Sequence, residues 1–155
     1  MTFSPRLLGL LLFASSASAS VPISSAPGDA SAVRSVLAHY NAAVERLDLI
    51  GTEALFAKDS RILESGSDEG NYAYYKAHHL VPELAEFKSL RFSDYKINVH
   101  FEGVTALVIE TYKYRIETKK GEVAERFGVS TSVLRKAQGR WQVIMLHSSA
   151  RRPSN

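Results

Sequence analysis

From Leu90 to Ser149 the apolar residues of this chain recur at every second position, and short turn signals interrupt the pattern three times. A period of two is typical of β-strands, whose side chains point alternately to the two faces of a sheet. Turns are expected at Gly103, at Lys119–Glu122 and at Ala137–Arg140. The second half of the chain is therefore predicted to be a meander of about four antiparallel strands.

The region before this meander has the period of helices instead. Asp29 is expected to be the N-cap of a first helix, because apolar residues follow it at spacings of three and four. This stripe consists of Val33, Val36, Leu37, Tyr40, Val44 and Leu47. Asn71 is expected to cap a second helix, with a stripe of Ala73, Ala77, Leu80, Leu84 and Phe87. Pro82 interrupts that stripe and lacks a backbone donor, so a kink, or a break shortly before it, is predicted.

The segment between the two helices is predicted to be short and irregular. A helical turn is expected to end at Ala57, followed by a short strand over residues 60–65 and a loop over residues 66–70. Helices that precede a meander of strands are typical of the α+β class, in which helices cover one face of an antiparallel sheet.

The length of each turn decides which residues of the meander share a face. Loops with an even number of residues are expected at Lys120-Gly121 and at Gln138-Gly139. One face would then hold Val108, Glu110, Tyr112, Tyr114, Phe127, Val129, Thr131, Val133, Ile144 and Leu146. The other would hold Leu107, Ile109, Thr111, Ser130, Ser132, Leu134, Trp141, Val143, Met145 and His147.

Both faces of this predicted sheet are apolar at their centre, whereas a sheet with one solvated side carries polar residues there. The helices can cover only one of the two faces. A second copy of the chain is therefore predicted to cover the outer face in a symmetric homodimer. The alternative is that the two ends of the chain lie across it.

Residues 1–20 have the features of a secretory signal peptide. Arg6 precedes an apolar run over residues 7–13, and an Ala-x-Ala arrangement follows at Ala17 and Ala19. The run is shorter than the roughly 20 residues that a membrane-spanning helix needs, so no stable membrane anchor is expected. Residues 21–28 are predicted to be a flexible leader, residues 29–150 a single domain and residues 151–155 a tail. The protein is therefore expected to be periplasmic or secreted.

The composition excludes several classes of function. The 155 residues include no cysteine, which excludes disulfides and thiolate metal sites. The formal net charge is +3 and the basic residues are scattered along the chain, so no nucleic-acid partner is expected. An apolar content of 45% in a chain of this length is enough for one hydrophobic core.

The order of these elements, together with the segment Gly139-Arg-Trp-Gln-Val and the terminal His147-Ser-Ser, resembles the nuclear transport factor 2-like superfamily. Within it the chain looks like the SnoaL-like branch and the association domain of calcium/calmodulin-dependent kinases, over about residues 30 to 150. The resemblance implies a cone-shaped roll, in which a curved antiparallel sheet wraps around N-terminal helices and leaves a cavity at the wide end. It also implies frequent dimers but no single activity, because the superfamily includes isomerases, cyclases, dehydratases and binding domains.

One enzymatic branch of that superfamily can be compared residue by residue. Ketosteroid isomerase-like sites pair a carboxylate base with a tyrosine and a protonated aspartate inside an apolar cavity. The corresponding strand here offers Glu110, Tyr112 and Tyr114, and no aspartate lies among them. No catalytic residue is therefore carried over from the resemblance.

The candidate ligand-binding residues are Tyr72, His79, Glu83, Tyr112 and His147. His79 and Glu83 are four positions apart on the second helix, so they could form an acid–base pair or hold a metal. If His147 faced the same cavity, the three would make a metal site with an open position. The alternative is an ordinary hydrogen bond on the helix surface. Tyr72 and Tyr112 would each offer a ring and a hydroxyl to a planar or apolar ligand.

Together these features favour an exported, homodimeric domain that binds a small molecule. No cofactor and no resident metal are expected. The alternatives are an isomerase, cyclase or hydro-lyase that uses His79 or His147 as its base, and a periplasmic metal-binding protein.

Overall fold

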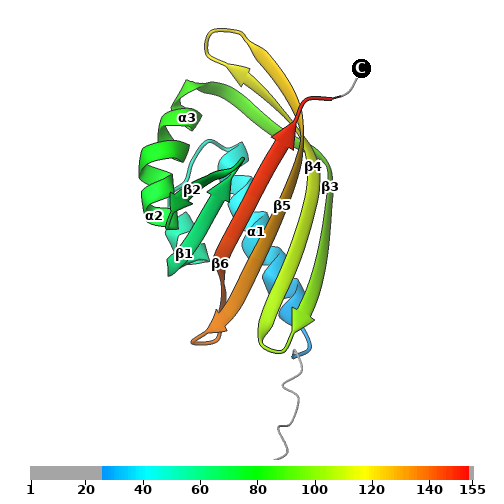
Figure 1. Ribbon diagram of the computed structural model, residues 1–155. Helices are drawn as coiled ribbons and strands as arrows, with labels where there is room; N and C mark the ends of the chain where they lie inside the picture. Colours follow the sequence, from blue (N-terminus) through cyan, green and yellow to red (C-terminus); the bar gives the residue numbers. More distant parts are fainter. Residues whose placement is uncertain (1–25, 154–155) are drawn as a thin grey trace, which may run out of the picture.

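The structure is a computed structural model that describes residues 26–153, and Figure 1 shows its two layers, a curved sheet and the helices packed on one side of it. The helical elements are α1 (Asp29–Glu45), the 3-10 turn η1 (Thr52–Leu55), α2 (Tyr72–Tyr75), the π-helical turn η2 (Lys76–Leu80) and α3 (Val81–Glu86). The strands are β1 (Phe56–Glu64), β2 (Ser67–Gly70), β3 (Phe87–Glu102), β4 (Thr105–Thr118), β5 (Val123–Ala137) and β6 (Arg140–Arg151).

All six strands belong to one sheet, in the order β2-β1-β6-β5-β4-β3. β1 runs parallel to β6, and the other neighbouring pairs are antiparallel. The predicted α+β class, with N-terminal helices packed against a curved and mostly antiparallel sheet, is confirmed.

The two ends of the chain carry expectations that the fold addresses only in part. The expected signal peptide over residues 1–20 and most of the expected leader over residues 21–28 lie outside the described residues. Within residues 26–153, no helix is both long enough and apolar enough to cross a membrane. The last strand, β6, continues to Arg151, the first residue of the predicted tail.

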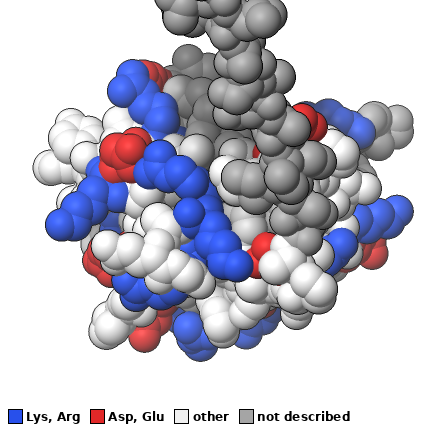
Figure 2. Space-filling model, turned by 90° about the horizontal axis from the view of Figure 1, so that it is seen from below, with Lys and Arg blue, Asp and Glu red and all other residues white. Residues whose placement is uncertain are grey.

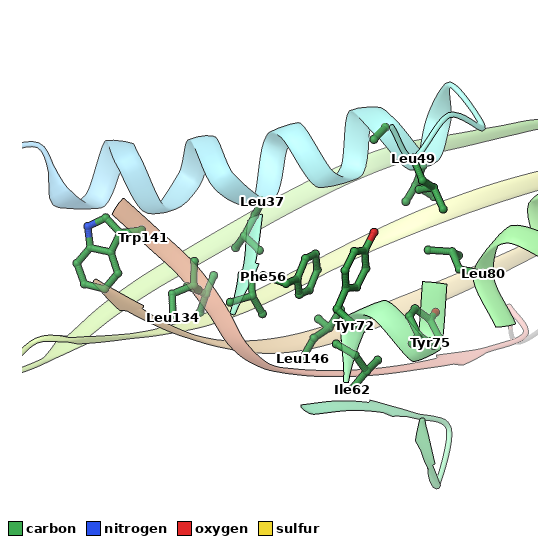
Figure 3. Packing of buried hydrophobic residues seen from close by; sticks show 14 of the residues in the cluster. Leu37, Leu49, Phe56, Ile62, Tyr72, Tyr75, Leu80, Leu134, Trp141 and Leu146 are labelled. Carbon is green, nitrogen blue, oxygen red and sulfur yellow. The ribbon is translucent and has the colours of Figure 1, made fainter. Parts of the chain in front are cut away.

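The core lies between α1 and the inner face of the sheet. Val33, Leu37 and Val44 are buried on the predicted stripe of α1, which confirms the helical period found in the sequence. Figure 3 shows the rings of Phe56 and Tyr72 lying flat against each other in this core, and their centroids are 3.7 Å apart. Burial of such rings removes a large apolar area from water, which is the main driving force for this packing.

The start of α1 is attached to the β5–β6 hairpin through one carboxylate. Asp29 is the first helical residue and Gly28 the N-cap, so the predicted capping role of Asp29 is wrong by one position. The Asp29 side chain accepts hydrogen bonds from Trp141 Nε1 at 2.9 Å and from Lys136 Nζ at 2.8 Å. These bonds lower its pKa from 3.8 to about 2. On the surface of this end of the molecule, basic side chains are interspersed with acidic and uncharged ones (Figure 2).

The segment between α1 and β3 is more regular than its sequence indicates. β1 begins at Phe56, within the predicted helical turn, because Phe56 and Ala57 are buried and β1 gains β6 as a partner. The predicted loop over residues 66–70 contains the short strand β2, which pairs with the end of β1.

The second predicted helix is divided into three segments. Asn71 caps it as predicted, by accepting a hydrogen bond from the Tyr74 N–H at 2.9 Å. Ahead of Pro82, which lacks an N–H, the helix widens into η2, where the Val81 N–H donates to the Lys76 carbonyl five residues back. The helix also ends earlier than predicted, because Phe87 is already the first residue of β3.

The predicted combination of β4 and β5 residues on each face is wrong because one loop is odd-numbered. Lys119, Lys120 and Gly121 form a three-residue loop, which is closed by the Thr118 N–H donating to the Glu122 carbonyl at 2.9 Å. Gly121 has a φ of 87°, as the last residue of such loops requires. Every residue of β5 therefore shares its face with the other set of β4 residues, and not with the set predicted. Ser130 and Ser132 pair with Glu110 and Val108 and share the inner face with them.

The predicted inward direction of His147 is also wrong, for a different reason. The two-residue loop at Gln138-Gly139 is confirmed, and Val143 is buried as the alternation requires. A bulge then shifts the register, so that Leu134 pairs with Val143 but Val133 pairs with Met145. The extra residue turns Leu146 inward and leaves His147 exposed on the outer face.

The acid sensitivity of the fold tests the role of Asp29. Its pKa is lower in the folded chain than its ordinary value of 3.8, so its contribution to stability is present above about pH 4 and is lost as the pH falls toward 2. The Asp29→Asn protein should melt at a lower temperature at pH 7 and lose less of its stability between pH 4 and pH 2. Thermal unfolding followed by circular dichroism measures both effects.

The matched control is Asp59→Asn, which removes an exposed carboxylate that faces Arg135. This variant should behave as the native protein does. Equal melting temperatures for native and Asp29→Asn proteins at pH 7 would show that the contacts of Asp29 do not hold α1 to the hairpin.

Candidate functional site

A cavity of about 170 Å³ lies between the helices and the inner face of the sheet. α1 contributes Tyr40 and Asn41 to its wall, and α3 contributes Glu83 and Leu84. The inner faces of β3 to β6 supply most of the remainder, including Phe92, Glu110, Tyr112, Tyr114, Ser130, Ser132 and Leu146, and β1 and α2 add Glu64 and Tyr75. The cavity is therefore lined by apolar and aromatic side chains together with several polar ones, a combination found in small-molecule sites.

Glu110 is the polar centre of this cavity. It occupies an inward position of β4 and only 3% of its surface is exposed. Asn41 Nδ2 donates to Glu110 Oε1 at 3.1 Å, and Ser130 Oγ donates to Oε2 at 3.0 Å. The Tyr95 hydroxyl also donates to Oε1. Three neutral donors from three different elements thus satisfy one buried carboxylate, as its burial requires.

Backbone irregularities bring the neighbours of Glu110 into place. The β3–β4 register shifts between Ser93 and Lys96, and Asp94 within this bulge has a φ of 51°. The bulge allows Tyr95 to direct its hydroxyl toward Glu110. On the other side, Tyr112 lies across Gly128, where a Cβ atom would be only 2.2 Å from the Tyr112 ring. Gly128 is therefore required for this position of Tyr112.

The aromatic groups of the cavity are strongly desolvated. Burial raises the pKa of Tyr112 to about 12, and the negative charge of Glu110 adds to the increase. The Phe92 ring lies edge-on to that of Tyr112, with centroids 5.2 Å apart, and 6.4 Å from that of Tyr114. These three rings form a continuous aromatic wall.

A second polar group lies where α2 and α3 face the end of β1. The Tyr75 hydroxyl donates to Glu64 Oε2 at 2.8 Å. His79 Nε2 is 3.6 Å from Glu64 Oε2 and 3.8 Å from Glu83 Oε2, while its Nδ1 is 3.5 Å from Glu69 Oε2. Burial raises the pKa of Glu83, and the charge of Glu64 raises it further, against the opposing effect of His79.

The structure brings together some of the predicted site residues and separates others. Glu83 and Tyr112 line the cavity, and His79 lies against Glu64 and Glu83 beside it. Tyr72 belongs to the core instead, because its ring stacks on Phe56 and its hydroxyl donates to Thr52 Oγ1 at 2.7 Å. The prediction that Tyr72 lines the pocket is therefore wrong.

The three-residue metal set of His79, Glu83 and His147, considered as an alternative, is not formed. His147 lies on the outer face of the sheet, opposite to the side on which His79 and Glu83 lie, because of the bulge in β6. Among residues 26–153, no group of three or more histidine, aspartate or glutamate side chains is arranged to hold a metal ion.

Sequence reasoning missed Glu64 and Ser132, and it did not select Glu110. A signal for Glu110 was present, because it is a lone acidic residue between inward apolar positions of β4, Val108 and Tyr112. Ser132 could not be linked to Glu110, because an even-numbered loop before β5 would have put the two residues on opposite faces of the sheet. Glu64 lies on the inner face only because β1 pairs with β6, which its own sequence does not reveal.

Ser132 is a buried hydroxyl without a partner. None of its surface is exposed, and its Oγ has no hydrogen-bond partner among the described residues. The residue lines the cavity two positions from Ser130, on the same face. A buried polar group that no protein atom satisfies is usually satisfied by water or by a ligand.

The comparison with protein families gives one match, to a SnoaL-like domain, over residues 33–153. The comparison with curated proteins gives no match. Many solved structures have the same fold. One is a candidate ketosteroid isomerase from Shewanella frigidimarina, which is 24% identical, has a TM-score of 0.65, and covers 76% of this chain and 94% of its own.

Two further structures illustrate the range of proteins that share this fold. A candidate dehydratase of the nuclear transport factor 2-like family from Streptomyces avermitilis is 18% identical, with a TM-score of 0.70 and coverage of 82% of this chain and 99% of its own. A candidate calcium/calmodulin-dependent protein kinase II association domain from Xanthomonas campestris is also 18% identical, with a TM-score of 0.62 and coverage of 90% and 98%. These similarities establish the fold and leave the activity open.

Two serines on β5 provide a matched test of the cavity floor. Ser132→Ala removes a buried hydroxyl without a partner, so the free energy of unfolding should rise by about 1 kcal/mol. Ser130→Ala removes a donor to the buried Glu110 carboxylate, so the free energy of unfolding should fall by about 1–3 kcal/mol. Denaturant unfolding of the three proteins measures both differences. Equal losses in the two variants would mean that the Ser132 hydroxyl has a partner after all.

Proposed function

This chain belongs to the SnoaL-like domain family, and we propose that it binds a small organic molecule in the cavity above Glu110. The proposal rests on one observation. The cavity has an aromatic wall, and among the polar groups opposite this wall the Ser132 hydroxyl has no hydrogen-bond partner in the described residues. A cavity that served only as a packing defect would be lined by apolar groups alone. Here it contains one buried carboxylate and one free hydroxyl.

The size of the cavity limits the ligand. An apolar cavity of about 150 Å³ is large enough for benzene. The 170 Å³ measured here therefore suits a compound of similar or slightly larger size, or one end of a longer molecule. Glu110 and Ser132 would orient its polar group, and Phe92, Tyr112 and Tyr114 would contact its apolar part.

A second candidate function is acid–base catalysis of the isomerase or dehydratase class. One observation favours it, namely the His79 ring close to Glu64 and Glu83, both of which line the cavity. An imidazole beside carboxylates can transfer protons near neutral pH. Two of the proteins with this fold are a candidate isomerase and a candidate dehydratase. Conversion of a bound compound by the native protein, and not by His79→Gln, would support this function.

We also propose that the protein is a homodimer formed through the outer face of the sheet. Leu107, Ile109 and Val129 are 40%, 53% and 47% exposed on that face, in the adjacent strands β4 and β5. Apolar side chains gathered on one sheet face are costly in water and typical of subunit interfaces. A second copy would cover them with the same surface of its own sheet.

A ligand screen tests the proposed binding function. Ligand-observed NMR with a library of small aromatic, aliphatic, charged and neutral compounds should identify ligands of the native protein. Ser132→Leu adds an isobutyl group to the cavity floor and should abolish their binding. Its control is Thr131→Leu, which introduces a leucine at the neighbouring position on the outer face and should leave binding intact. The proposal would be contradicted by equal binding to both variants, or by a screen without ligands.

Sedimentation tests the proposed dimer. Ile109→Asp places a charge in the apolar patch and should weaken self-association at least about tenfold. Val123→Asp is the control, because Val123 is equally exposed, at 52%, but lies at the end of β5 beside the loop. A native protein that sediments as a single subunit at high concentration would exclude this interface.

A further inference from the structure

The charged groups that line the cavity all have the same sign. Glu64, Glu83 and Glu110 are among its lining residues, whereas no lysine, arginine or histidine of the described chain is. Buried charges in proteins are usually paired with charges of opposite sign, because their removal from water is costly. A cavity lined by three carboxylates therefore favours positive charge in its contents.

Protein groups compensate these carboxylates only in part. Glu110 is buried, yet its three donors are the neutral side chains of Asn41, Tyr95 and Ser130. Glu64 accepts from the neutral Tyr75 hydroxyl, and it shares the single imidazole of His79 with Glu83 and Glu69. Among the described residues, no lysine or arginine forms an ion pair with Glu64, Glu83 or Glu110, and the partly exposed His79 at the mouth of the cavity is the basic side chain next to Glu64 and Glu83.

The effect of this charge reaches the tyrosines of the wall. Burial raises the pKa values of Tyr40, Tyr75 and Tyr112, and the negative charge of Glu64 raises each of them further. Arg126, which pairs with Tyr114 from β5, has the opposite effect: its positive charge lowers the pKa of Tyr114. The guanidinium of Arg126 donates to the carbonyl of Glu125 and is not part of the cavity lining.

Aromatic rings complete a site for positive charge. Phe92, Tyr112 and Tyr114 stand side by side beyond Glu110, with the centroids of Tyr112 and Tyr114 6.2 Å apart. The faces of such rings attract ammonium groups, and most strongly where water is excluded. Hard metal ions, in contrast, require a shell of six or more oxygen ligands, which an aromatic wall does not provide.

We infer that the ligand is a small organic cation, an amine or quaternary ammonium compound, whose charged group lies between Glu110 and the Phe92–Tyr112–Tyr114 wall. The inference rests on the proposed function, since it names the class of ligand for the same cavity. The unpartnered Ser132 hydroxyl would accept a hydrogen bond from an amine or pair with a hydroxyl of the ligand.

Three probes of nearly the same shape and different charge test this inference. Choline is positively charged, 3,3-dimethylbutan-1-ol is its neutral carbon analogue, and 3,3-dimethylbutanoate carries a negative charge. Calorimetric titration of the native protein should give a dissociation constant for choline at least about tenfold lower than that for the alcohol. The carboxylate should not bind measurably.

Variants that remove one carboxylate test whether a preference for choline over the alcohol arises in the cavity. Glu110→Gln keeps the shape of the side chain, and it should reduce choline binding about tenfold or more, a clearly larger loss than that of alcohol binding. Should this variant fold poorly, Glu64→Gln at the mouth should reduce choline binding in the same direction. Glu102→Gln is the control, because this side chain is 83% exposed at the far end of β3 and should have no effect.

The outcomes separate the inference from the function on which it rests. Alcohol binding as tight as choline binding, lost in Ser132→Leu, would overturn the cationic ligand and keep the binding cavity. Choline binding that is unchanged in both Glu110→Gln and Glu64→Gln would place the cation elsewhere and overturn the inference. Absence of binding by all three probes would overturn it as well, while the compound screen would decide the proposed function independently.

Discussion

The burial of Glu110 is the constraint on which the arrangement of the cavity depends. A carboxylate withdrawn from water costs several kcal/mol unless hydrogen-bond donors replace the water. Asn41, Tyr95 and Ser130 supply these donors from α1, β3 and β5. The position of the helix, the bulge in β3 and the register of β5 are therefore coupled through one side chain. A shift of any one of these elements would leave a buried charge with too few partners.

A residue that imposes such a cost needs a reason to be present, and ligand recognition is the one that the surroundings favour. Val108, on the same strand and face, shows that an apolar side chain packs well at an inward position of β4. The aromatic wall lies beside this carboxylate, and the Ser132 hydroxyl has no hydrogen-bond partner among the described residues. In a complex, the same three features would act together on one small molecule.

Much of the fold could be predicted from local patterns, and the errors have specific physical causes. The α1 stripe, the Asn71 cap and the Gln138-Gly139 turn are local features, and each was predicted correctly. Strand parity is not local, because a single extra residue in a loop or a bulge reverses every position that follows. The three-residue loop ending at Gly121 reverses the positions of β5 in this way, and the bulge before Met145 reverses those of the second half of β6. For that reason Ser132 was not predicted to lie beside Glu110 and His147 was predicted to point inward, whereas Glu83 and Tyr112, which were selected from the sequence, do line the cavity.

The central claim is that a ligand lies between Glu110 and the aromatic wall and that this ligand carries positive charge. The most direct measurement is the nuclear Overhauser effect between the N-methyl protons of bound choline and the ring protons of the protein. Choline bound at this position should give contacts to Phe92, Tyr112 and Tyr114 that disappear in Glu110→Gln. Contacts to side chains of the outer face alone, such as Ile109 or His147, would contradict it.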